Sequence, residues 1–414
     1  TIMFRILLAT LLITFTRVIA AQGTRQVIRA SSKIVDIRDG DHFKRGYWYI
    51  MPEKNPDYYF VEIPEKPHRV TFITDVDSIS FEMEYGMEVD FIILLNGKDS
   101  CHTRISAKYR NLHPLTRKKN TSISDTLSFV LGGNDKIYLK GIVNGSHPLD
   151  IQFDLGAGGP VINKSSVEKV NMALDEIITL QNSDGINQVP SASKNILEIG
   201  NLIWDSVRIA VADNMTHRED LILGNSMFKN KIMEIDYDKK ILVVHHALPT
   251  IGKSYSQHNL ILDGAIPFVE GNLTFRGKTQ KGWMLFDTGA YTSILNSEDV
   301  SATNKMLGEA RKMIGLGNEW SAPKLNIGSY ALMGFNYSTQ KMKGDGIQLL
   351  LGNDLLKRFN LVLDNRNGFI YLKPNSLTNN TFSNPEYYVV RIALGLLILL
   401  IGTLVYFKMR KKKR

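Results

Sequence analysis

Cysteine is almost absent from this sequence, since Cys101 is the single one among 414 residues. One cysteine cannot form an intrachain disulfide, and it cannot build a cysteine-ligated metal or iron–sulfur centre. Cys101 is therefore interpreted as a small, half-buried residue. Motifs of two catalytic classes are missing as well, because the chain has neither a Gly-x-Ser-x-Gly nucleophile elbow nor a His-Glu-x-x-His zinc motif.

The composition is otherwise that of a globular protein, with 43% apolar and 22% charged residues. It excludes a disordered or collagen-like chain, and 414 residues suffice for several cores. The net charge of +9 by itself invites a nucleic-acid or membrane-surface partner. Whether that inference holds depends on where the charges lie.

The N-terminus has the pattern of a secretory signal. An apolar stretch, 4–16, contains Arg5 near its start and leads into Arg17-Val18-Ile19-Ala20-Ala21. This length suits a signal peptide (residues 1–20) better than a membrane span, and cleavage is expected near Ala20. An uncleaved anchor is the alternative.

The C-terminus has the pattern of a membrane anchor. Residues 392–407 are uncharged, and the predicted transmembrane helix covers 388–407 if Arg391 reaches the interface. The tail that follows, 408–414, is strongly basic, and an excess of cations marks the cytoplasmic side. We therefore expect a single-pass membrane protein with a cytoplasmic tail and an extracytoplasmic body, either periplasmic or extracellular.

These two ends account for most of the charge. Six cations lie in the tail and two in the signal, which leaves +1 of the total +9 for residues 21–407. A nearly neutral body gives no support to a nucleic-acid partner, so none is expected.

The body is predicted to be mostly β, because short runs rich in Val, Ile, Phe and Tyr alternate with Gly, Asn and Asp. Residues 22–112 are interpreted as a separate N-terminal β module without recognisable chemistry, and the polar stretch 113–127 as a linker. The clearest helical signal is a capping-box pattern at 165–168, which predicts a short helix ending near Leu174.

The rest of the body repeats itself. Four anchors recur in the same order, and the spacings from the second to the third anchor (24 residues) and from the third glycine to the closing aspartate (12 residues) are identical in both copies. The anchors of the first copy are Phe153-Asp154-Leu155-Gly156-Ala157, Leu197-Glu198-Ile199-Gly200-Asn201, Leu221-Ile222-Leu223-Gly224-Asn225 and Glu234-Ile235-Asp236. Those of the second are Phe286-Asp287-Thr288-Gly289-Ala290, Leu325-Asn326-Ile327-Gly328-Ser329, Leu349-Leu350-Leu351-Gly352-Asn353 and Val362-Leu363-Asp364.

The first anchor of each copy carries an aspartate, Asp154 or Asp287, between an apolar strand and a Gly-Ala turn. Two such units related by a pseudo-twofold axis would bring both carboxylates together. Like charges about 3 Å apart do not both ionise easily, so the pair shares a proton. One member then acts as base and the other as acid, as hydrolysis of a peptide by an activated water requires.

The doubled Asp-x-Gly-Ala, with an apolar-apolar-Gly motif later in each copy, resembles the aspartic proteases. The Asp-Thr-Gly-Ala form and the short copies are most similar to retroviral-type peptidases fused in tandem. The resemblance covers about 136–374 and implies an all-β, bilobal pair of β-barrels, with a first lobe at 128–250 and a second lobe at 255–376. It implies a catalytic dyad of Asp154 and Asp287.

The resemblance also assigns supporting roles around the dyad. Gly156 and Gly289 belong to the catalytic loops, and Gly224 and Gly352 pack beneath them. In both lobes of the family, a Thr or Ser hydroxyl after the aspartate grips the opposite loop. Thr288 supplies one such hydroxyl, whereas Leu155 cannot.

A second departure concerns the donors to the two carboxylates. Ala157 and Ala290 stand where pepsin-like enzymes carry a hydroxyl donor. Fewer donors to the charged form predict a higher pKa for the dyad and an activity optimum closer to neutral pH than that of pepsin.

A flap over the cleft is expected between the first and second anchors of each lobe. The candidates are Asp184 and Gly185 in the first lobe, and Gly315, Gly317 and Trp320 in the second. Ordinary hairpins are an equal alternative for both segments.

Together these features predict a membrane-anchored aspartic endopeptidase that acts on an extended peptide as a monomeric catalytic unit, without a metal or another cofactor. The alternative is a membrane-tethered peptide-binding protein of the same fold, in which Leu155 has impaired catalysis.

Overall fold

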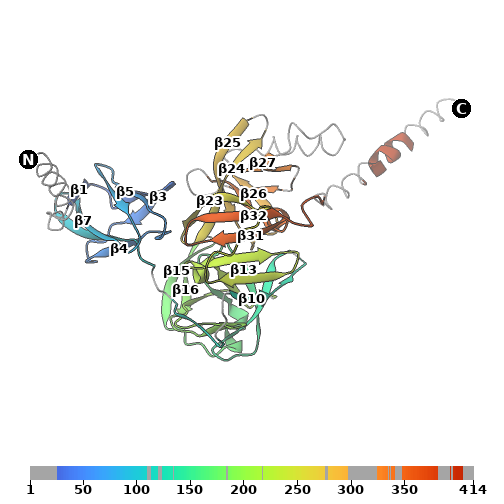
Figure 1. Cartoon of the computed structure of the whole chain (residues 1–414), viewed down its shortest axis with the longest axis horizontal. Coiled ribbons are helices and arrows are strands. Elements are labelled where there is room, and N and C mark those ends of the chain that lie inside the picture. The colour runs from blue at the N-terminus through green and yellow to red at the C-terminus, as the bar shows by residue number, and fades with distance from the viewer. Residues whose placement is uncertain are drawn as a thin grey trace, which may run out of the picture. The chain divides into compact units, whose positions relative to one another are not determined.

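The computed structural model of the protein describes residues 26–109, 113–119, 124–133, 135–182, 185–216, 218–275, 278–296, 324–333, 335, 337–340, 347–380, 392 and 395–403. The chain divides into two compact units, Thr1–Lys108 and Tyr109–Arg414. Nearly all their regular elements are strands, which confirms the prediction of an all-β body (Figure 1).

The first unit is a sandwich of two four-stranded sheets. One sheet has the order β1 (Gln26–Ala30), β7 (Glu88–Leu95), β8 (Asp99–Ser106), β4 (Asp57–Phe60), and the other β3 (His42–Tyr49), β2 (Ile34–Asp39), β5 (His68–Ile73), β6 (Ser78–Met83). Buried and more exposed side chains alternate along the strands, as in β5, so each sheet turns one face to a shared core. Cys101 lies in that core and is fully buried rather than half-buried.

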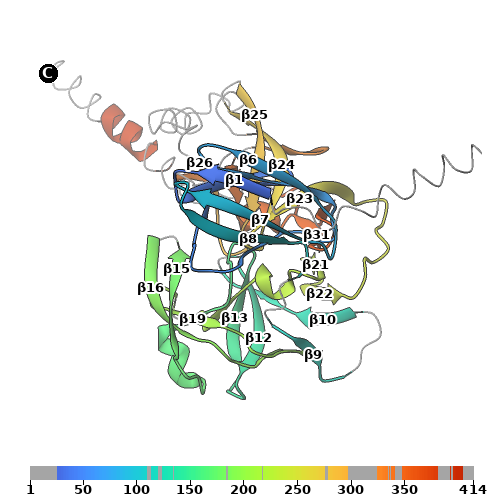
Figure 2. The same ribbon diagram turned by 90° about the vertical axis from the view of Figure 1, so that its left-hand side faces the viewer.

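The second unit contains two larger sheets. The first comprises β9 (Leu115–Arg117), β11 (Val130–Leu131), β12 (Ile137–Val143), β13 (Leu149–Asp154), β14 (Val161–Asn163), β15 (Glu176–Asn182), β16 (Gly185–Ala192), β17 (Leu197–Ile199), β18 (Leu202–Trp204), β19 (Ile209–Ala212) and β20 (Leu221–Gly224). Figure 2 shows it at the bottom of the view, with the hairpin β15–β16 at one edge.

The other sheet contains the strands of the second lobe together with three strands that come from the first. It comprises β10 (Ser124–Ser128), β21 (Ile232–Asp236), β22 (Ile241–His245), β23 (Ser256–Asp263), β24 (Ile266–Phe275), β25 (Lys278–Phe286), β26 (Ser293–Asn296), β27 (Lys324–Ile327), β28 (Tyr330–Met333), β29 (Tyr337–Gln340), β30 (Ile347–Leu351), β31 (Phe359–Asp364) and β32 (Phe369–Pro374).

The strand pairings around the repeated motifs are the same in both lobes. Strand β13 runs parallel to β20, which is antiparallel to β14, and β14 runs parallel to β19. In the second lobe β25, β30, β26 and β29 pair in the same way. A short helix follows the repeated glycine in each lobe, η2 (Asn225–Phe228) or α3 (Asn353–Leu356). The sequence repeat is therefore a structural repeat.

A six-stranded layer, ordered β10-β22-β21-β31-β32-β23, joins the two lobes. Each lobe supplies three of its strands, and the central pair is β21 with β31, where Glu234 lies opposite Val362. The order is symmetric about this pair, since each half is a hairpin with one further strand outside it. This continuous layer fixes the two lobes relative to each other.

Two local predictions need correction. The stretch 113–127, expected to be a linker, contributes β9, which pairs with β18, and most of β10, which pairs with β22. Both lie at the ends of their sheets and are mostly polar; in β10 a buried position holds Asp125, which forms an ion pair with Arg117 of β9. The helix predicted to open at 165–168 is the 3-10 helix η1 (Lys164–Lys169), and Asn163 caps it by accepting a hydrogen bond from the Ser165 N–H.

In the part of the chain that the structure describes, which includes the helical residues 395–403, no helix is long and apolar enough to cross a membrane. The signal at 1–20, the tail at 408–414 and part of the predicted span 388–407 lie outside the described residues. The signal and the anchor therefore remain predictions.

Candidate functional site

Asp154 and Asp287 occupy equivalent positions at the ends of two strands, next to the buried residues Phe153 and Phe286. Asp154 is the last residue of β13, and Asp287 follows directly after β25. In each loop the second residue after the aspartate donates its N–H to the Oδ1 of that aspartate at 2.8 Å, from Gly156 in one loop and Gly289 in the other. Each strand thus presents its carboxyl group in the same, locally fixed orientation.

The two carboxyl groups are in hydrogen-bond contact with each other. The glycines make this approach possible, since a Cβ atom at Gly156 would lie 2.6 Å from Cγ of Asp287. A Cβ atom at Gly289 would overlap with the carboxyl group of Asp154. Only glycine fits at either position, because any side chain would separate the two acids.

Burial raises the pKa of both carboxyl groups, and the neighbouring negative charge of Asp287 raises that of Asp154 further. Asp287 has more donors to its charged form, because the N–H groups of Gly289 and Ala290 donate to it along with Asp154. Asp154 receives a single backbone N–H, from Gly156. The arrangement therefore favours one shared proton, carried on Asp154, with the charge on Asp287.

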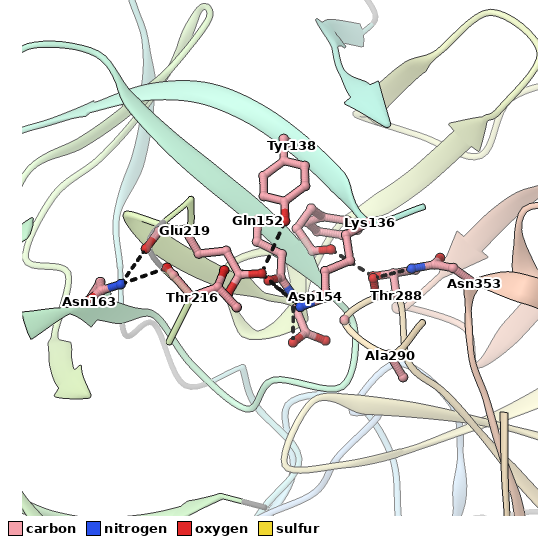
Figure 3. A network of polar contacts seen from close by, with 12 residues as sticks. Lys136, Tyr138, Gln152, Asp154, Asn163, Thr216, Glu219, Thr288, Ala290 and Asn353 are labelled. Carbon is pink, nitrogen blue, oxygen red and sulfur yellow. Dashed lines mark hydrogen bonds and ion pairs between the residues drawn. The ribbon is translucent and has the colours of Figure 1, made fainter. Parts of the chain in front are cut away.

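The Thr288 hydroxyl reaches across to the loop of the first lobe (Figure 3). It accepts a hydrogen bond from the Leu155 N–H at 3.0 Å and donates one to the Phe153 carbonyl at 2.9 Å. Leu155 is fully buried and has no hydroxyl with which to make the reciprocal bonds to the second lobe. The grip expected from the resemblance is therefore one-sided.

The loop of the second lobe is supported from below by Asn353. Its Nδ2 donates to the Thr288 carbonyl at 2.6 Å, and its backbone N–H donates to the Ala290 carbonyl at 2.9 Å. Gly352 precedes it, and a Cβ atom there would lie 2.5 Å from the backbone carbon of Thr292. This glycine packs directly against the chain beyond the loop of Asp287.

The equivalent residues of the first lobe pack alike but bond differently. A Cβ atom at Gly224 would overlap with the Ala157 carbonyl. Asn225 donates instead to the carbonyl of Ala265, at 2.8 Å, and to Asn365, at 3.1 Å. The two asparagines were not predicted as site residues, although their signal, Leu-Gly-Asn in both copies, is visible in the sequence.

Ala157 and Ala290 provide only backbone groups. The Ala290 N–H donates to Oδ1 of Asp287 at 3.0 Å, whereas the Ala157 N–H donates to the carbonyl of Asp154 at 3.1 Å. The carboxyl of Asp154 thus has one backbone donor fewer than its partner.

The flap candidate of the first lobe lies at the tip of the hairpin β15–β16. Gly185 pairs with Asn182 there and adopts φ 121°, a conformation that favours glycine. Asp184, Gly315, Gly317 and Trp320 lie outside the described residues.

The reacting groups that the site offers are two carboxyls that share a proton, a pair suited to general acid–base chemistry on a water molecule. Within the described ranges, no cluster of three or more His, Cys, Asp or Glu side chains is arranged to hold a metal ion.

No protein-family model matches the chain, and no curated protein matches it. Among solved structures, an aspartic proteinase from Irpex lacteus is similar, with a TM-score of 0.48 and 12% identity. The match covers 63% of this chain and the whole of the other. At that score and identity, the similarity adds nothing to the geometry of Asp154 and Asp287, on which the functional interpretation rests.

Proposed function

We propose that the protein is an aspartic-type endopeptidase whose two lobes correspond to tandem retroviral-type units. The observation that carries this proposal is the contact between the half-buried carboxyl groups of Asp154 and Asp287, which lie at the ends of equivalent strands. A structural role alone does not account for two acids held in contact, since two adjacent carboxyl groups do not both ionise easily. Strongly perturbed acids of this kind are typical of catalytic sites.

In the proposed reaction, Asp287 is the base and Asp154 the acid. The carboxylate of Asp287 takes a proton from a water molecule, whose oxygen attacks the peptide carbonyl carbon. Asp154 gives its proton to the carbonyl oxygen, and a tetrahedral gem-diol results. Asp287 then gives the proton it took from water to the amide nitrogen, while Asp154 takes a proton from one hydroxyl of the gem-diol. The C–N bond breaks, an acid and an amine leave, and both carboxyl groups regain their starting protonation. The donors of Gly289 and Ala290 favour charge on Asp287 before the attack.

The substrate proposed is an extended peptide, bound between the lobes by one catalytic unit that acts as a monomer. We further propose that the body acts outside the cytoplasm and is tethered by the predicted span at 388–407. The charge distribution of the sequence supports this topology.

The test is hydrolysis of an internally quenched peptide library between about pH 3 and pH 7, by the intact chain and by Asp287→Asn. The proposal predicts cleavage by the intact chain and its loss in the variant. Equal turnover by the two would overturn it.

A peptide-binding protein without catalysis is the second candidate, because the grip between the loops is one-sided. Binding of a statine-type transition-state mimic separates the two functions, since that affinity requires an organised pair of carboxyls. Tight binding supports the enzyme, and weak binding together with retained affinity for uncleaved peptides supports the binding protein.

A further inference from the structure

A buried polar network extends from Asp154 into the first lobe (Figure 3). The Nε2 of Gln152 donates to Oδ2 of Asp154 in a long hydrogen bond of 3.4 Å, and its Oε1 accepts from Nζ of Lys136 at 3.2 Å. The same Nζ forms an ion pair with Glu219 at 2.9 Å, and the Tyr138 hydroxyl donates to Glu219 at 3.2 Å.

The network is shielded from solvent. Gln152 and Glu219 are 1% and 3% exposed, and the Lys136 side chain is 17% exposed. Each of these groups adjoins its neighbour within hydrogen-bond distance, so the ammonium of Lys136 is separated from the carboxyl of Asp154 by a single amide. In a shielded site such a chain of hydrogen bonds polarises along its length, and electrostatic effects are larger than at the surface.

Among the described residues of the second lobe, the equivalent positions form no counterpart of this network. Strand register and the repeated anchors align the four positions with residues that are all apolar. The counterpart of Lys136 is Ile266, and that of Tyr138 is Phe268. The counterpart of Gln152 is Leu285, and that of Glu219 is Ile347. Phe268 packs with partly buried Ile266 and Leu285 in an apolar cluster. Two otherwise matched lobes therefore surround their aspartates with different chemistry.

We infer that Lys136 and Glu219, acting through Gln152, are positioning residues that set the charge balance of the Asp154–Asp287 pair. The inference rests on the proposed function, because it assigns the network a role in the same reaction. Lys136 favours the charged form of the pair and Glu219 opposes that effect, while Gln152 fixes the orientation of the Asp154 carboxyl.

The field of Lys136 reaches both acids, and it lowers the pKa of Asp154 and of Asp287 against the larger upward effect of burial. Other charged groups lie next to the network in the chain: Arg218 and Asp220 flank Glu219, and Asp220 pairs with Lys169. Asp287 lies opposite Asp154, and the ion pair of Asp135 with Lys357 adjoins Lys136, with Asp135 Oδ2 and Lys357 Nζ 2.5 Å apart. Tyr138 is the remaining titratable group of the network.

The test compares the pH profile of kcat/KM for Lys136→Met and Glu219→Gln. Removal of the cation raises the apparent pKa values of the pair, so both limbs of the profile move to higher pH by about one unit. Removal of the anion leaves the cation unopposed, so both limbs move to lower pH. Opposite shifts are a result that general destabilisation does not produce.

Lys140→Met is the matched control, because it removes the same charge from strand β12, where Lys140 is exposed and pairs with Asp150. It should leave the profile unchanged. If Lys136→Met fails to fold, Gln152→Leu is the second variant. It introduces the residue found at the equivalent position of the second lobe, and it interrupts the hydrogen-bond network without leaving Glu219 unpaired. The pH profile should then also move to higher pH.

Carbon-13 NMR titration of the aspartate carboxyls in the same variants gives a readout that needs no turnover. If the protein cleaves no peptide but the carboxyl pKa values shift in opposite directions in Lys136→Met and Glu219→Gln, this inference stands and the proposed function fails. Active variants with superimposable profiles would overturn the inference and leave the proposed function standing.

Discussion

The Thr288 hydroxyl accepts a 3.0 Å hydrogen bond from the Leu155 N–H, 133 positions away in the sequence. The same hydroxyl donates to the Phe153 carbonyl, so one side chain satisfies two buried backbone groups on either side of Asp154. Leu155 makes no side-chain bond in return, because it carries no polar atom. The loop of Asp154 is thus held from the opposite lobe, whereas the loop of Asp287 is held from within its own lobe, by Asn353.

Thr288→Val should therefore impair both folding and activity. The substitution keeps the shape of the side chain but leaves the Leu155 N–H and the Phe153 carbonyl without this partner, at a cost of about 1–3 kcal/mol for each buried group. Loss of orientation at the dyad should lower kcat about 100-fold. Urea unfolding and peptide turnover measure the two effects. Thr288→Ser retains the hydroxyl and is the control, and equal behaviour of the two variants would contradict the role of the hydroxyl.

Leu155→Thr should restore the second half of the grip. A hydroxyl at this position can bond to the opposite loop as Thr288 does, so kcat should rise even though the smaller side chain costs roughly 1–3 kcal/mol of stability. Leu155→Val matches the volume of threonine without its hydroxyl and should lose stability with no gain in kcat. A rise in kcat in both variants, or in neither, would show that the missing hydroxyl does not limit the reaction.

The arrangement around Asp154 and Asp287 was accessible from the sequence because it is repeated. Two identical spacings predicted that the two motifs fold alike, and the pairings β13–β20 and β25–β30 do match. The all-β character followed from short β-branched runs. The strands β9 and β10 were missed because they are mostly polar. Burial alternates along β10, but one of its buried positions holds Asp125, which pairs with Arg117, instead of an apolar residue.

The supporting groups were harder to predict, because their partners are distant in sequence and obey no period. Asn353 lies 65 residues from Thr288, and Lys136 lies 83 residues from Glu219. A lysine and a glutamate read one by one are most simply surface residues. The sequence showed the asparagine as part of a repeat, but only the fold shows what it supports.

Asp354 should make the stability of the second lobe pH-dependent. Burial raises the pKa of this carboxyl to about 6, although Ser293 donates to it at 2.9 Å. Because the unfolded chain releases this proton near pH 4, the folded state binds more protons between about pH 4 and pH 6, and stability falls as pH rises through that window. The free energy of unfolding should fall by at most roughly 3 kcal/mol over this window. Comparison of urea unfolding at pH 4 and pH 7 measures it.

Asp354→Asn removes the titration and should abolish that part of the pH dependence. Asp205→Asn, at an exposed aspartate, should behave as the unmodified chain does. If Asp354→Asn follows the same pH dependence as the unmodified chain, then Asp354 is not the group responsible.

His68 and Asp39 should stabilise the N-terminal module in mildly acidic solution. Burial lowers the pKa of His68, but its hydrogen bond with Asp39 outweighs this and leaves the pKa raised. The pKa of Asp39 is lowered, because the same contact outweighs the effect of burial. The stabilisation that His68 contributes is present below about pH 6.5 and is lost as pH rises through the pKa of His68 in the folded state. The stabilisation that Asp39 contributes is lost in acid, as pH falls through its lowered pKa.

Hydrogen exchange of residues 57–62 in the full chain, which include Tyr59 bonded to Asp39, measures this effect. Protection should peak in mildly acidic solution, and His68→Gln should remove the fall toward alkaline pH. His102→Gln on β8 is the control. An unchanged profile in His68→Gln would contradict the assignment.

The central claim is that Asp154 and Asp287 act as one catalytic unit, and the most direct measurement is peptide turnover by Asp154→Asn, Asp287→Asn and the double variant, with Asp150→Asn as control. Asp150 lies on the same strand as Asp154, but it pairs with Lys140 away from the dyad. Residues that act together are strongly non-additive. Each single variant should therefore lose about 1,000-fold or more, the double variant should lose no more than either single one, and Asp150→Asn should remain active. Turnover within tenfold of the unmodified chain in either single variant would contradict the account.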